Sequence, residues 1–151
     1  LGDQARLEGR IDEARDHYRR YLQKMREVSM PIGQAVATLN LAQAELGAGD
    51  LEAAGRHIDA ACDQLLSVGA LEGRRELVFS LRLALAAGRR DRERFRDLWK
   101  RVADGWPADW QLIRDNLWLL EVAADFAAEA GWEEVDDVRT LAGELERRLS
   151  D

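Results

Sequence analysis

The sequence predicts an all-α fold, a right-handed α-solenoid of about four antiparallel helical hairpins, and three observations lead to this prediction. Strand signals are missing, because the chain has no alternating runs of β-branched residues. An internal repeat of about 40 residues is present, which is typical of stacked helical units. Apolar residues recur at helical spacing in each segment, for example at Leu51, Ala54, Ile58, Ala61 and Leu65.

Prolines and glycines divide the chain into its predicted helices. Pro31 and Pro107 stand where a new periodic segment starts, and proline is tolerated in the first turn of a helix. Glycines close alanine- and leucine-rich segments, as expected at helix C-termini, at Gly9, Gly49, Gly88 and Gly131. The predicted helices span residues 1–8, 10–28, 31–48, 50–68, 72–87, 90–104, 108–130 and 132–149.

The repeat is clearest where residues 1–18 align with residues 41–58 without a gap, at an offset of 40. The equivalent pairs are Leu1 and Leu41, Gly2 and Ala42, Gly9 and Gly49, Ile11 and Leu51, Ala14 and Ala54, His17 and His57, and Tyr18 and Ile58. Two later units are degenerate, since Glu93 and Asp136 stand where the alignment expects alanine. A fixed period of this size predicts hairpins that bury their apolar faces by stacking on neighbours.

The spacing within this repeat resembles the tetratricopeptide repeat family. Leu1-Gly2 with Ala14-x-x-x-Tyr18, and Leu41-Ala42 with Ala54-x-x-x-Ile58, keep the family's internal pattern. The pitch exceeds the family's usual length of about 34 residues and is similar to long-pitch arrays of bacterial signalling proteins. A HEAT-like or irregular α-solenoid is the structural alternative.

The resemblance implies one repeat domain over residues 1–151, with units of about 1–28, 31–68, 72–104 and 108–149. Residues 1–9 match 41–49, the second half of a repeat's first helix, so we expect upstream residues that complete the first pair. The domain is then a fragment of a longer multidomain protein.

Composition narrows the partners and the compartment. The chain has 22 basic and 29 acidic side chains and a formal net charge of −7, which argues against nucleic acid as a partner. No apolar run approaches the roughly 18 residues of a membrane span. Cys62 is the single cysteine, which fits a reducing compartment. We therefore expect a cytoplasmic protein with no membrane or nucleic-acid partner.

The residues that could carry chemistry have structural explanations. The two histidines, His17 and His57, occupy equivalent repeat positions, so the repeat accounts for them without an active site. No motif for a metal, a phosphate or a catalytic nucleophile occurs. The acidic residues near the start of helix 132–149 complement the helix dipole, with a basic partner as the alternative. We predict no enzyme activity, no cofactor and no metal.

Two further segments allow a partner. The basic segment 89–101 is interpreted as a solvated helix face, with an acidic partner or nucleic acid as alternatives. The five tryptophans lie between residues 99 and 132, and they form either a packed corner or an exposed recognition patch.

The first helices of the hairpins are predicted to line a concave partner-binding face. Arginines and an apolar strip on it suit a protein or peptide ligand with some acidic character. The predicted residues of this face are Leu39, Asn40, Gln43, Arg75, Val78, Phe79, Arg82, Trp118, Glu121, Val122 and Asp125. Helix 31–48 has no Lys or Arg, so the carboxylate clamp of some family members is not expected.

The predicted function is therefore a non-catalytic protein–protein interaction scaffold. The family resemblance implies the repeat region of a bacterial signalling or regulatory protein of the Ser/Thr kinase or ATPase-type regulator kind. Self-association into a homo-oligomer is one alternative. A helical enzyme domain with an unrecognised site is the other.

Overall fold

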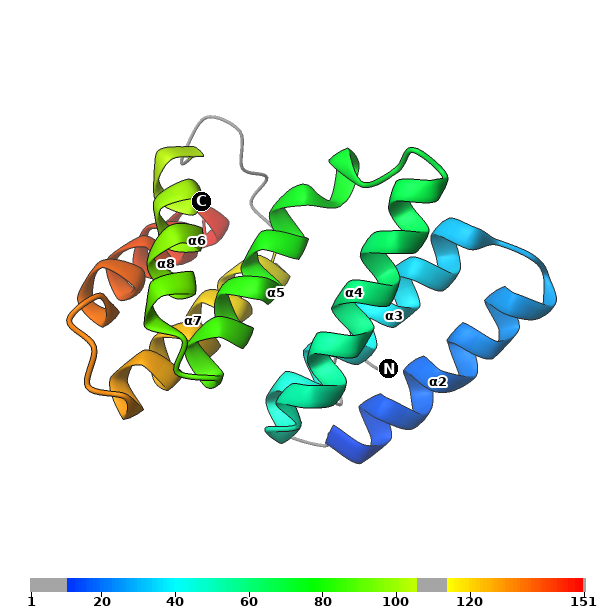
Figure 1. Ribbon diagram of the computed structural model, residues 1–151, viewed down its shortest axis with the longest axis horizontal. Helices are drawn as coiled ribbons and strands as arrows, with labels where there is room; N and C mark the ends of the chain where they lie inside the picture. The colour runs from blue at the N-terminus through cyan, green and yellow to red at the C-terminus, as the bar shows by residue number, and fades with distance from the viewer. Residues whose placement is uncertain (1–10, 106–113, 151) are drawn as a thin grey trace. The chain divides into compact units, whose positions relative to one another are not determined.

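The computed structural model describes residues 11–105 and 114–150, and all regular secondary structure in these ranges is helical (Figure 1). The elements are α2 (Ile11–Glu27), α3 (Pro31–Ala48), α4 (Leu51–Ser67), the 3-10 helix η1 (Glu72–Arg74), α5 (Arg75–Gly88), α6 (Arg92–Gly105), α7 (Arg114–Glu129) and α8 (Val135–Ser150). The all-α prediction is confirmed for these residues. Predicted helix 1–8 and the predicted start of helix 108–130 lie outside the described residues.

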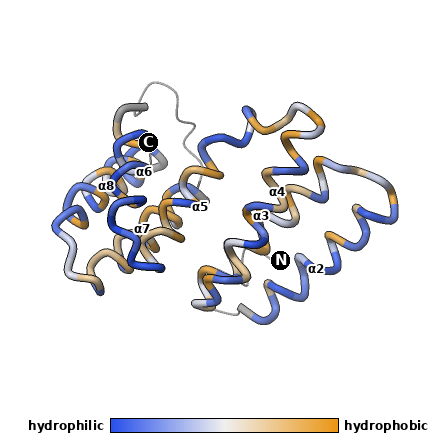
Figure 2. The backbone as a smooth tube through the Cα atoms, in the orientation of Figure 1, coloured by the Kyte–Doolittle hydropathy of each residue, from blue (hydrophilic) through white to orange (hydrophobic). Residues whose placement is uncertain are grey.

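The chain divides into two compact units, Leu1–Val78 and Phe79–Asp151. In the first unit, α2, α3 and α4 run antiparallel, and α3 packs against both α2 and α4 (Figure 1). A helix with neighbours on two sides needs apolar residues on more than one face, and α3 is apolar over most of its length (Figure 2). Its buried residues are Ala35, Ala37, Thr38, Leu39, Leu41, Ala42, Gln43, Ala44, Glu45 and Leu46.

The repeat predicts which residues of the first unit are buried. Ala14 and Ala54, equivalent at an offset of 40, are both fully buried, and so are their larger companions Tyr18 and Ile58. On the α2 side the core contains Ala14, Tyr18, Leu22, Ala37, Leu41 and Ala44. Small residues at positions 14 and 54 let neighbouring helices approach closely, while the aromatic or branched residue one turn later fills the space beside them.

In the second unit, α7 packs against α8, and side chains join these helices to α5 and α6. The Ser80 hydroxyl of α5 donates a hydrogen bond to Asn116 Oδ1 of α7 at 3.3 Å, and both residues are buried. The fully buried Phe95 ring of α6 contacts Trp132, which follows α7, with ring centroids 5.2 Å apart. Buried polar groups are satisfied in such pairs, and the aromatic contact anchors the α7–α8 turn to α6.

Five helices end in the same backbone motif. A left-handed residue follows each helix at Ser29, Gly49, Gly69, Arg90 and Gly131. At each end the left-handed residue and the next residue donate their N–H groups back to the last turn, as Gly49 does to Leu46 (3.1 Å) and Asp50 to Glu45 (2.9 Å). This is the Schellman arrangement, which satisfies carbonyls that would otherwise lack partners. The left-handed residues are 20, 20, 21 and 41 residues apart, so the helix period is regular.

One turn lies two residues later than the sequence indicates. The glycine rule favours Gly88 as the residue that closes its helix, but Gly88 is the last residue of α5, and the left-handed residue is Arg90, with φ of 58°. Asp91 then caps α6, because its Oδ1 accepts the Arg94 N–H at 3.1 Å, as Asp50 accepts the Ala53 N–H in α4. The equivalent of Ala54 is therefore Phe95 rather than Glu93, since each donates its N–H to the capping aspartate's carbonyl.

Candidate functional site

The predicted partner-binding residues on α3 are largely inaccessible. Leu39 and Gln43 are fully buried, and Asn40 is half-buried. The physical reason is the position of α3 between α2 and α4, which leaves this helix little surface of its own. Neither Leu39 nor Gln43 can therefore present its side chain to a partner in this structure.

The predicted residues on α5 are partly accessible. Arg75 is exposed and lies 3.2 Å from Glu72 Oε1, Phe79 and Arg82 are half-buried, and Val78 is buried. Arg75 and Arg82 are seven residues apart, which places them on one side of the helix two turns apart. This side of α5 stays a predicted contact surface, without Val78.

The predicted residues on α7 lead to a groove. Glu121 and Asp125 are exposed, one helical turn apart, while Trp118 and Val122 are half-buried. Glu121 and Asp125 line a cavity of about 190 Å³ between α7 and α8. We call this cavity the α7–α8 groove, and its lining residues are Glu121, Ala124, Asp125, Arg139, Ala142, Gly143 and Glu146.

The groove exists because its floor is made of small residues. Ala124 of α7 and Ala142 of α8 are buried, and Gly143 contributes no side chain. A Cβ atom placed on Gly143 would meet no atom within 4 Å, so open space lies directly above its backbone. The residues on α8 were missed in the sequence, although a glycine inside a helix costs about 1 kcal/mol relative to alanine and is a signal of close packing or function.

The walls of the groove carry opposite charges at its two ends. Arg139 Nη2 of α8 lies 3.9 Å from Asp125 Oδ1 of α7. Burial raises the pKa of Glu121 above its ordinary value, and the nearby carboxylates of Glu146 and Asp125 raise it further. Glu121 and Glu146 thus form an acidic end, and Asp125 with Arg139 forms a paired end.

Two other charged clusters hold helices together. Arg92 and Arg96 of α6 donate hydrogen bonds to the Glu134 carboxylate, Arg96 Nε at 2.7 Å from Oε1. Burial opposes ionisation of Glu134, but the hydrogen bonds from Arg96, its own backbone and Arg92 outweigh it and lower its pKa below the ordinary value. Two of the arginines in segment 89–101 are therefore engaged in fixing the start of α8.

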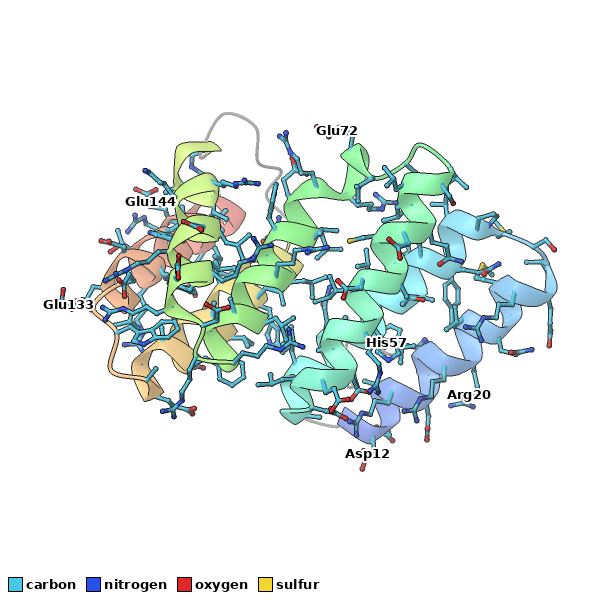
Figure 3. The ribbon with its side chains drawn as sticks, viewed as in Figure 1. Asp12, Arg20, His57, Glu72, Glu133 and Glu144 are labelled. Atoms are coloured by element: carbon cyan, nitrogen blue, oxygen red, sulfur yellow. The ribbon has the colours of Figure 1, made fainter. Side chains whose placement is uncertain are left out.

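The histidines and tryptophans lie as follows. His17 and His57 are both half-buried, and His57 projects from α4 on the side where α2 lies (Figure 3). Burial lowers the pKa of His57 below its ordinary value, and the positive charges of Arg56 and Arg19 add to this effect against Glu45 and Asp50. Trp132 is buried, Trp99 and Trp118 are half-buried, and the predicted tryptophan corner at 106 and 110 lies outside the described residues.

Two searches of the described residues and three comparisons complete the description of the site. Within residues 11–105 and 114–150, no group of three or more His, Cys, Asp or Glu side chains could hold a metal ion. No helix in the same ranges is long and apolar enough to cross a membrane. Comparison with protein-family models gives no match, and comparisons with curated proteins and with solved structures give none either.

Proposed function

We propose that this chain is a non-catalytic protein–protein interaction scaffold that binds a peptide segment of a partner along its helices. The observation behind the proposal is the α7–α8 groove, because it contains an accessible cavity beside Glu121 and Asp125, two residues of the predicted partner face. Helix-lined grooves of this kind hold extended or helical peptides through side-chain pockets.

The regular helix period supports the repeat part of the proposal. Equivalent helix ends recur 40 or 41 residues apart, at Ser29 and Gly69 and at Gly49, Arg90 and Gly131. We propose on this basis a tetratricopeptide-type α-solenoid with about four hairpins. From the family resemblance, we place it in the cytoplasm as the repeat region of a larger bacterial signalling or regulatory protein.

Selection from a random peptide library displayed on phage tests the proposal. We expect enrichment of a peptide class that binds the chain in calorimetry with a micromolar Kd. Glu121→Gln combined with Gly143→Leu should weaken this binding by about tenfold or more, equivalent to about 1.4 kcal/mol. Glu129→Gln removes an exposed carboxylate of the same helix that does not line the groove, and it should leave the Kd unchanged.

The other predicted surface serves as the competing site in that experiment. If the selected peptides lose affinity in a Phe79→Ala/Arg82→Ala variant and keep it in the groove variant, the binding surface is on α5 and the groove is not the site. Circular dichroism of each variant confirms that the helices are retained. A chain that enriches no peptide would contradict the interaction function itself.

Self-association is a second candidate, favoured by a different observation. The first unit exposes five large apolar side chains at one end, which we call the apolar end: Val28, Met30, Ile32, Leu66 and Val68. The three helices of this unit run antiparallel, so the α2–α3 connection and the end of α4 lie at the same end, and Gln64 Nε2 of α4 donates to Gln34 Oε1 of α3 at 3.0 Å there. Exposed apolar groups that gather in this way mark interaction surfaces.

Light scattering coupled to size exclusion tests this candidate. If the apolar end joins two copies, the wild-type mass should rise toward a dimer as concentration increases. Leu66 is 67% exposed, so Leu66→Lys should prevent that rise without loss of helix content. A monomer mass at every concentration would rule self-association out and leave the peptide-binding proposal intact.

A further inference from the structure

We propose that the α7–α8 groove receives an arginine side chain of the partner, with the guanidinium at the end formed by Glu121 and Glu146 and the aliphatic stem over Ala142 and Gly143. This inference depends on the proposed function, because it names the chemistry of the segment bound at the same site.

The order of residues along the two helices defines the ends of the groove. On α7, Glu121 precedes Asp125 by one turn, and on α8, Arg139 precedes Glu146 by about two turns. Asp125 lies opposite Arg139, whose Nη2 is 3.9 Å from its Oδ1, and Glu121 lies close enough to Glu146 for their charges to interact. The helices are thus antiparallel at this contact, and the two glutamates face each other across one end.

Charge complementarity selects a cation at that end. Two carboxylates that approach each other across a cavity repel, and the raised pKa of Glu121 reflects this repulsion together with burial. A guanidinium placed between them would remove the repulsion and form two charge-assisted hydrogen-bonded pairs in fork geometry. Lysine has a point charge without this fork, so arginine fits the pair of carboxylates better.

The opposite end is already neutralised, and weakly held. The Asp125 and Arg139 side chains are 76% and 56% exposed, and their nearest N–O distance is 3.9 Å. An exposed ion pair of this length contributes little free energy. It orients the incoming side chain by presenting a positive group at the end where a second cation would be repelled.

The floor accommodates the apolar part of the ligand. Ala124 and Ala142 are buried, and the space above Gly143 is open, so a chain of methylene groups can lie against the backbone of α8. Arginine stems cover apolar surface in this manner while the charged head stays near solvent. A neutral ligand of the same length would gain the floor contact and leave the carboxylate repulsion in place.

The test uses three small probes and amide NMR spectra of the isotope-labelled chain: N-acetyl-arginine amide, N-acetyl-lysine amide and N-acetyl-citrulline amide. Citrulline has the length of arginine and no charge. We expect the arginine probe to shift the Ala142 and Gly143 amides with a Kd in the millimolar range. The lysine probe should bind more weakly, and the citrulline probe should bind about tenfold more weakly or not at all.

Variants assign the effect to the groove. Glu121→Gln should weaken arginine binding several-fold, and added salt should weaken it in the wild type. Gly143→Leu should abolish it by filling the floor. Gly143→Ala adds a smaller group where a Cβ meets nothing, so it should fold as the wild type does and bind less tightly. Glu129→Gln, with the same charge change on α7, should bind as the wild type does.

Three results would overturn the inference: equal binding of the citrulline probe, binding of the lysine probe as tight as arginine, or unchanged binding in Gly143→Leu. These results leave the proposed function standing if the peptide selection yields binders that contact other surfaces. Conversely, a failed selection together with a shifted Gly143 amide would reject the peptide scaffold while retaining the arginine site.

Discussion

The Glu45 carboxylate on α3, of which only 2% is exposed, is held by the Arg15 guanidinium on α2, whose Nε donates to Oε1 at 2.9 Å and whose Nη2 contacts Oε2. Arg19 of α2 also approaches Glu45, at 4.0 Å. A carboxylate buried in a helix contact stays ionised only because a cation accompanies it.

Arg15→Ala should therefore destabilise the chain by about 3 kcal/mol, because it leaves the buried Glu45 charge uncompensated. Urea unfolding measured by circular dichroism gives the free energy difference. Arg20→Ala, an exposed arginine on the same helix, is the control and should change stability by less than about 0.5 kcal/mol. A double variant, Arg15→Met with Glu45→Leu, should recover much of the loss, and equal losses in the single and double variants would contradict this account.

The register of the third repeat unit is tested at Phe95. Phe95 is fully buried against Trp132, whereas Glu93, two residues earlier, is exposed. Phe95→Ala should cost about 3–5 kcal/mol through the lost burial and the cavity left behind. Glu93→Ala should be within about 0.5 kcal/mol of the wild type. Comparable losses in the two variants would show that the unit begins elsewhere.

The left-handed conformation of Arg90 offers a stabilising substitution. Non-glycine residues strain the backbone at positive φ, and Arg90 has φ of 58°. Arg90→Gly should raise the free energy of unfolding by about 0.5–1 kcal/mol, less than the full strain because glycine also loosens the unfolded chain. The reverse change at an equivalent helix end, Gly131→Ala, should lower it by about 1 kcal/mol. Thermal unfolding of both variants checks the pair, and a destabilised Arg90→Gly would mean that the Arg90 side chain has a contact of its own.

Acid should destabilise the first unit through His57. Burial holds the pKa of His57 below its ordinary value of 6.5, so the unfolded chain takes up this proton at higher pH than the folded chain does. The resulting stability is present above about pH 6.5 and is lost as the pH falls from there toward the lower folded-state pKa. His57→Gln should show a shallower loss between about pH 7 and pH 5 in urea titrations, with His17→Gln at the equivalent position as the control. Identical pH dependence in His57→Gln and the wild type would contradict the prediction.

The helices were predictable from the sequence because their 3.6-residue period and their end signals are local. The exposed face of α3 was not, since a helix that is apolar on most sides gives no direction from periodicity alone, and Leu39 and Gln43 proved buried. The α7 half of the groove was predicted through Glu121 and Asp125, but the α8 half depends on how two helices meet. Only the glycine at position 143 marked it in advance. The Arg90 turn was missed because glycine is the usual residue there, and Gly88 stood close by.

The equivalence of the helix ends makes whole hairpins interchangeable as units of recombination. Gly49-Asp50 and Arg90-Asp91 are the same junction, a left-handed residue followed by a capping aspartate, 41 residues apart. Excision of residues 50–90 would join Gly49 directly to Asp91 and rebuild that junction with glycine in the left-handed position. A gene could therefore gain or lose one copy at this point without creating a new turn, and such chains are expected to vary in hairpin number more readily than in hairpin length.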